Sequence, residues 1–167
     1  MNTNSDLLPA GAEFSPCRQY RYTLWRIWDQ RRPLVMCIGL NPSTANANKN
    51  DNTINILMRV LKELGFGGFY MTNLFAWISS DPEILVYTNA VGERNDEILQ
   101  DIASQCDTII ACWGTFKQAS NRIVQVAPRF QGRLKCFGVN QDGTPFHPRA
   151  LSYKGLLNKA VLINYHI

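Results

Sequence analysis

Four short stretches of the chain, three of them mainly apolar, predict β-strands. Residues 34–38 are apolar on both faces and end at Gly39, which is typical of a strand in a parallel sheet covered on both sides. Residues 69–74 and 108–113 predict two further buried strands, and residues 133–137 predict a short fourth strand. Together these runs predict the four strands of one largely parallel sheet.

Helical periodicity separates the runs. Apolar side chains recur at three- and four-residue intervals over residues 54–64, with Asp51 or Asn52 placed to cap the first turn and Gly65 placed to end the helix. Further helices are expected within residues 98–102, 116–126 and 151–162. Because strands alternate with helices, the sequence predicts a three-layer α/β fold with right-handed crossovers and helices on both faces of the sheet.

The N-terminal region is expected to add one strand to this sheet. Residues 20–28 alternate in a way that predicts a β-strand, which pairs antiparallel with the 34–38 strand or covers a sheet edge. Residues 1–14 have few apolar anchors and predict a flexible lead-in. The chain has 167 residues, too few for two ordinary domains, so residues 15–167 are expected to form a single domain.

The amino-acid composition argues against a membrane protein and against a secreted protein. No run approaches the roughly 20 apolar residues of a membrane span, and the N-terminus lacks the apolar core of a secretory signal. We therefore expect a cytoplasmic protein with no membrane partner.

The five cysteines are scattered without a C-x-x-C pair, so we expect reduced thiols, no metal site and no cofactor. The net charge of +4 is modest for a nucleic-acid-binding protein, and the oligomeric state stays open.

The candidate binding and catalytic residues lie where the predicted strands end. Ligands of open parallel sheets bind beyond the carboxyl ends of the strands. A turn of Gly39, Leu40, Asn41, Pro42 and Ser43 follows the first strand. Asn73 ends the second strand, and His147 lies in a proline-framed loop after the fourth. Each feature alone has an ordinary explanation as an Asx turn, a buried amide bound to main chain or a packed loop histidine. Their expected convergence on one sheet end favours a functional site.

These motifs resemble those of the uracil-DNA glycosylase superfamily. The Gly39-Leu40-Asn41-Pro42 turn resembles its Gly-x-Asn-Pro motif, and Tyr70-Met71-Thr72-Asn73 resembles the strand that reads the base. The segment from His147 to Gly155 resembles its His-Pro-Ser loop. The Leu-Asn-Pro-Ser-Thr-Ala sequence at residues 40–45 is also similar to a bacterial family of unknown function.

The glycosylase resemblance implies a glycosylase-like α/β fold and a role for each matching residue. Asn41 and His147 would be the catalytic pair. Asn41 would position the attacking water, and His147 would donate a hydrogen bond to the base oxygen as negative charge builds on the leaving base. Asn73 would read the edge of a base extruded from the stack.

Supporting roles follow from the same resemblance. Leu151 would wedge into the stack that the extruded base leaves. Contacts to phosphate or DNA would come from Ser43, Arg149, Ser152 and Lys154. The base would lie against the turn formed by Gly39, Leu40 and Pro42 and stack on Phe75 or Trp77.

The sequence also departs from the superfamily. Asn41 is not an ionised carboxylate, Arg149 replaces a small serine, and residues 46–52 differ from the loop that lines a uracil pocket. The leading hypothesis is therefore a hydrolase or recognition protein for a base in DNA or a nucleotide, without a defined base. Two alternatives stay open: a non-catalytic nucleic-acid or nucleotide-binding module, and an enzyme that acts on a small phosphorylated nucleoside.

Overall fold

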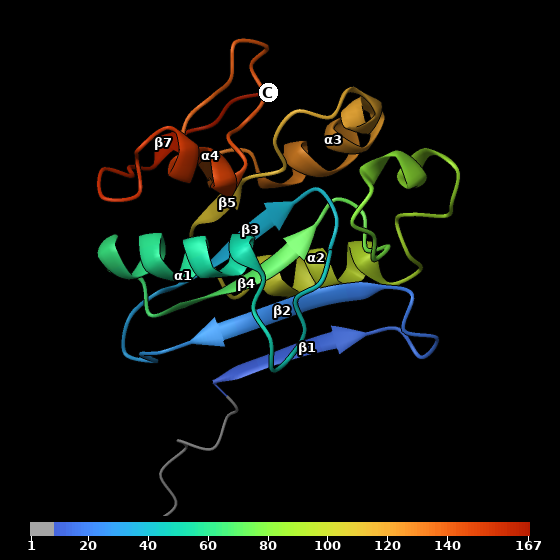
Figure 1. The fold of residues 1–167 in the computed structure, drawn as a ribbon, viewed down its shortest axis with the longest axis horizontal. Helices are drawn as coiled ribbons and strands as arrows, with labels where there is room; N and C mark the ends of the chain where they lie inside the picture. The colour runs from blue at the N-terminus through green and yellow to red at the C-terminus, as the bar shows by residue number, and fades with distance from the viewer. Residues whose placement is uncertain (1–8) are drawn as a thin grey trace, which may run out of the picture.

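Seven strands form one mixed sheet in the computed structural model, which describes residues 9–167 (Figure 1). The order of the strands across the sheet is β1-β2-β4-β3-β5-β6-β7. Their bounds are Ala10–Phe14 for β1, Arg21–Ile27 for β2, Leu34–Gly39 for β3, Gly68–Asn73 for β4, Ile109–Ala111 for β5, Leu134–Cys136 for β6 and Ile163–Asn164 for β7. The four central strands β4, β3, β5 and β6 are parallel to one another, as the apolar runs predict.

Four α-helices flank the sheet, together with three short 3-10 segments. The α-helices are α1 at Asn52–Glu63, α2 at Asn95–Ala103, α3 at Ser120–Val126 and α4 at Pro148–Tyr153. The 3-10 segments are η1 at Pro82–Val86, η2 at Lys117–Ala119 and η3 at Ala127–Phe130. In the part of the chain that the structure describes, no helix is long and apolar enough to cross a membrane.

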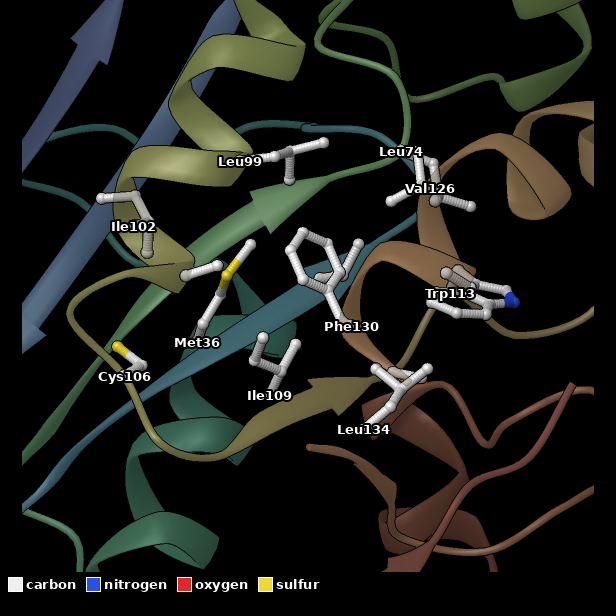
Figure 2. Close-up of a cluster of buried hydrophobic side chains, with 14 of the residues drawn as sticks. Met36, Leu74, Leu99, Ile102, Cys106, Ile109, Trp113, Val126, Phe130 and Leu134 are labelled. Carbon is white, nitrogen blue, oxygen red and sulfur yellow. The ribbon is translucent and has the colours of Figure 1, made fainter. Parts of the chain in front are cut away.

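Alternate side chains of β3 point into two separate cores, one on each face of the sheet. Met36 and Ile38 pack into a cluster built with α2, α3 and Phe130, which Figure 2 shows in close-up. Val35 and Cys37 pack into the other cluster, built with α1 and α4. All four side chains are fully buried. The predicted three-layer arrangement with helices on both faces is therefore confirmed.

The predicted capping of α1 is also confirmed. The Asp51 carboxylate accepts a hydrogen bond from the Ile54 N–H at 2.9 Å, which satisfies a backbone donor of the first turn. Gly65 has a φ of +89°, a left-handed conformation that glycine adopts without a steric penalty and that commonly follows the end of a helix.

Two predictions about the N-terminal region are wrong. Residues 10–14 of the expected lead-in form strand β1, which pairs antiparallel with β2; residues 1–8 of that lead-in lie outside the described residues. Strand β2 pairs with β1 and β4 rather than with β3, and it does not form an edge. The reason is topological, because both edges of β3 are already occupied by β4 and β5.

The closing helix predicted at residues 151–162 is much shorter in the structure. Helix α4 ends at Tyr153, and Gly155 follows with a φ of +68°. The Leu156 N–H donates to the Leu151 carbonyl at 2.7 Å, which closes the helix end. The chain then returns to the sheet as β7, the short antiparallel partner of β6.

Candidate functional site

A cavity of about 350 Å³ lies at the carboxyl ends of β3, β4 and β5. Gly39 ends β3 and Asn73 ends β4, while Gly114 follows β5. The N-terminus of α1 and the loop that carries His147 complete the wall. Seven residues selected from the sequence line this cavity: Gly39, Leu40, Asn41, Ser43, Asn73, His147 and Arg149. The structure thus brings the three separate motifs to one place.

Asn73 lines the cavity and carries an unpaired amide. Its side chain is 1% exposed, and neither its Oδ1 nor its Nδ2 has a hydrogen-bond partner. Buried polar atoms are almost always paired, because leaving one unpaired costs about 1–3 kcal/mol. An amide that is unpaired at both ends and lines a cavity is therefore suited to bind a ligand that offers both a donor and an acceptor.

The surrounding structure holds Asn73 rigidly in this position. The Asn95 amide donates to the carbonyls of Asn73 and Leu74 at 3.0 and 3.1 Å, and Arg122 Nε donates to the Leu74 carbonyl at 2.8 Å. A Cβ at Gly39 would lie 2.8 Å from Asn73 Oδ1, so any other residue there would crowd the amide. The hydrogen bonds fix the backbone at the end of β4, and the absence of a side chain at Gly39 avoids a clash with the amide.

The side-chain amide of Asn41, unlike that of Asn73, forms hydrogen bonds within the protein. Its Nδ2 donates to three carbonyls, those of Pro42 at 3.1 Å, Trp77 at 3.4 Å and Ser79 at 2.9 Å. The amide nitrogen therefore ties the turn after β3 to the segment after β4. No hydrogen bond from the described residues reaches Oδ1, so the acceptor end is available to a water or ligand.

His147 is a neutral donor in this site. Its Nδ1 accepts a hydrogen bond from the Arg149 N–H at 3.1 Å, which caps α4 and places the proton of the neutral ring on Nε2. Burial, and secondarily the charge of Arg149, lowers the pKa of His147 to about 4. At pH 7 the imidazole is therefore uncharged and offers Nε2–H as a donor.

Two charged residues of the cavity were not selected as site residues from the sequence. Arg21, at the start of β2, is 3% exposed and lines the cavity together with Asp51, the cap of α1. The available sequence signal was an arginine in a strand of mostly apolar and aromatic residues. The Ser79 and Ser80 turn also lines the cavity, and Ser80 Oγ lies 3.2 Å from Ser43 Oγ.

Five residues selected from the sequence do not line the cavity: Pro42, Phe75, Leu151, Ser152 and Lys154. Leu151 is fully buried in the α1 and α4 core, so the prediction that it wedges into a base stack is wrong. Phe75 packs against the opposite core, and Trp77 packs edge-on against Tyr20, so neither offers a stacking face to the cavity.

Ser152 and Lys154 are exposed outside the cavity, and the ammonium of Lys154 lies over the Phe146 ring. Pro42 is buried, and its carbonyl accepts hydrogen bonds from the Ser79 N–H and the Asn41 amide. Among residues 9–167, no group of three or more His, Cys, Asp or Glu side chains is placed to hold a metal ion.

Residues 21–149 match a family described as a protein of unknown function (DUF1643). The chain belongs to this family. The matched range includes Arg21, Asn41, Asn73 and His147, so the family region contains the cavity and ends just inside α4. No curated protein and no solved structure matches the chain.

Proposed function

We propose that the cavity binds a nucleobase and that the protein hydrolyses the N-glycosidic bond of that base in DNA or in a nucleotide. The observation that supports this most directly is the unpaired amide of Asn73. A base edge offers an adjacent donor and acceptor, and an Asn side chain forms two parallel hydrogen bonds with such an edge. A lactam edge, with its carbonyl beside a ring N–H, complements Asn73 fully.

The other groups of the cavity suit the chemistry of a leaving base. Negative charge builds on a base oxygen as the glycosidic bond breaks, and a fixed donor stabilises it. The Nε2–H of His147 is such a donor, and the low pKa of its imidazole keeps the ring neutral in the resting site. Asn41 Oδ1 is free to accept a hydrogen bond from the attacking water. These roles, and a glycosylase-like fold, are the ones implied by the resemblance of the motifs.

A second candidate function is base binding without turnover. Asn41 is a neutral amide, and Asp51, the only Asp or Glu of residues 9–167 that lines the cavity, also caps α1. The described part of the site therefore has no carboxylate free to act solely as a general base. This observation favours a module that binds the same base without hydrolysing its glycosidic bond.

Excision assays test the proposal. Oligonucleotides that carry uracil, hypoxanthine or a modified pyrimidine are incubated with the protein, and abasic sites are measured by alkaline cleavage. We expect product from the natural protein and a loss of about 100-fold or more in Asn41→Ala and His147→Ala. Asn73→Ala should lose both product and base binding. Asn121→Ala is the matched control, because Asn121 is exposed and lies outside the cavity.

The two functions give different results in the same assay. Binding of a nucleoside that depends on Asn73, without abasic product from any oligonucleotide and without release of free base from the matching nucleotides, would establish the binding module. If there is neither product nor Asn73-dependent binding of a base or nucleoside, the proposal is wrong in both forms.

A further inference from the structure

We infer that Arg21 forms an anion subsite in the same cavity and that it holds a phosphate group of the ligand. This inference rests on the proposed function for the base, since the base would bind at Asn73. It defines the substrate class more narrowly as a nucleotide with its phosphate inside the cavity, either free or within a strand.

Arg21 differs from the other buried arginines in the described part of the chain. Arg122 is 5% exposed and pairs with Asp96, and Arg26 is 6% exposed and donates to Asn50 and to several backbone carbonyls. Arg21 donates from Nη1 to the Ala45 carbonyl at 2.8 Å, but its Nε has no partner. Of these three arginines, only Arg21 lines the cavity.

The charge of Arg21 is also uncompensated by an ion pair. No carboxylate within residues 9–167 forms an ion pair with it. Burying a charged group without an ion-pair partner is costly, because the group loses its hydration, and the attraction of Asp51 offsets this cost only in part. Desolvation lowers the pKa of Arg21 to about 10, so the guanidinium remains charged at pH 7. A buried cation with an unused donor at the wall of a cavity is suited to an anionic ligand.

The surroundings of Arg21 favour an anion despite the presence of Asp51. The charged residues that line the cavity are Arg21, Arg149 and Asp51, which sum to one positive charge while His147 is neutral. The N-terminus of the 12-residue helix α1 also faces the cavity and adds a positive dipole end. The hydroxyl groups of Ser43 and Ser80 supply further donors.

The size of the cavity is consistent with a ligand larger than a base. Pockets for small molecules and cofactors commonly have volumes of about 300–1,000 Å³. The cavity of about 350 Å³ falls at the lower end of that range, and Asn73 and Arg21 both line it. A nucleoside monophosphate would use both groups, whereas a free base would leave Arg21 unpaired.

Calorimetric titration with matched ligands tests the subsite. The ligands are 2′-deoxyuridine and 2′-deoxyinosine, their 5′-monophosphates, and single-stranded oligonucleotides that carry the same bases. We expect the monophosphate to bind about 10- to 100-fold more tightly than the nucleoside, and we expect Arg21→Gln to abolish that difference. Tighter binding of the oligonucleotide than of the monophosphate would identify a strand as the source of the phosphate, and the reverse would identify a free nucleotide.

Arg32→Gln is the matched control, because it removes the same charge from an exposed loop before β3, at the opposite end of that strand from the cavity. It should bind every ligand as the natural protein does. If Arg32→Gln loses the phosphate preference as Arg21→Gln does, the effect comes from net charge and the subsite is disproved.

Thermal unfolding separates ligand binding from a structural role of Arg21. Inorganic phosphate should raise the melting temperature of the natural protein but not that of Arg21→Gln. In phosphate-free buffer Arg21→Gln should remain folded, since the desolvation cost of the buried charge is removed together with its hydrogen bond to the Ala45 carbonyl. A marked loss of stability without ligand, together with an unchanged response to phosphate, would show that Arg21 is only structural.

The failure of this inference differs from the failure of the proposed function. Nucleosides that bind through Asn73 without any gain from a phosphate would disprove the subsite and leave the base site intact. Conversely, phosphate binding that depends on Arg21, without binding of any base or nucleoside, would support the subsite and disprove the base site.

Discussion

Asn41 and Asn73 show how the fold gives different uses to the same residue type. Asn41 follows β3, Asn73 ends β4, and both line the cavity. The amide nitrogen of Asn41 donates hydrogen bonds to three backbone carbonyls, whereas both polar side-chain atoms of Asn73 are buried without a partner. Sequence position placed both residues at the sheet end. Only the packed structure decides which of them has an amide available to a ligand.

At the same scale, His147 should make the stability of the protein depend on pH. Its pKa is about 4 in the folded protein and about 6.5 in an unfolded chain, so the unfolded state binds more protons between these values. Stability should therefore fall as the pH drops from 6.5 to 4, by up to about 1.4 kcal/mol per pH unit from this residue.

His147→Gln should flatten this part of the profile, and urea unfolding of both proteins across the window measures the difference. Carboxylates that titrate in the same range contribute to both profiles, so the comparison isolates His147. Parallel slopes would mean that the imidazole is protonated in the folded protein at its ordinary pKa.

Helix α4 shows at the level of an element how one motif can both line the cavity and pack into the core. His147 caps its first turn, Arg149 donates the capping N–H, and Leu151 anchors it in the core shared with α1. The periodicity of residues 151–162 predicted a long closing helix, but local conformation at Gly155 ends α4 early. The helix therefore serves mainly to fix the loop that carries His147.

We expect Leu151→Ala to destabilise the fold by about 2–5 kcal/mol, because it removes a fully buried side chain and leaves a cavity. Chemical denaturation measures this loss. Tyr153→Ala is the control in the same helix, since Tyr153 is 76% exposed and should be nearly neutral. Unchanged stability of Leu151→Ala would contradict the burial of this side chain in the core.

At the scale of the whole molecule, the two cores on either side of the sheet determine which thiols are accessible. Cys37 and Cys112 lie in one core, Cys106 and Cys136 lie in the other, and all four are buried. Burial raises the pKa of Cys106 to about 11 and also raises those of Cys37 and Cys136. Cys17 is exposed, and a hydrogen bond with Ser15 lowers its pKa.

Thiol titration should therefore report the integrity of the whole fold. In the native protein at neutral pH we expect one cysteine to react rapidly with a disulfide reagent, and five to react after denaturation. Cys17→Ser should remove the rapid phase entirely. Rapid reaction of two or more thiols in the native protein would contradict the packing of these cores.

The sequence by itself determined the central strands, helix α1 with its cap, and the convergence of three motifs on one sheet end. These follow from apolar periodicity and from the rule that the carboxyl ends of parallel strands meet at one edge. Tertiary structure alone decided the pairing of β1 and β2, the burial of Leu151 and the place of Arg21 in the cavity. The physical reason is that strand pairing, burial and hydrogen-bond satisfaction depend on partners distant in the chain, which local pattern does not encode.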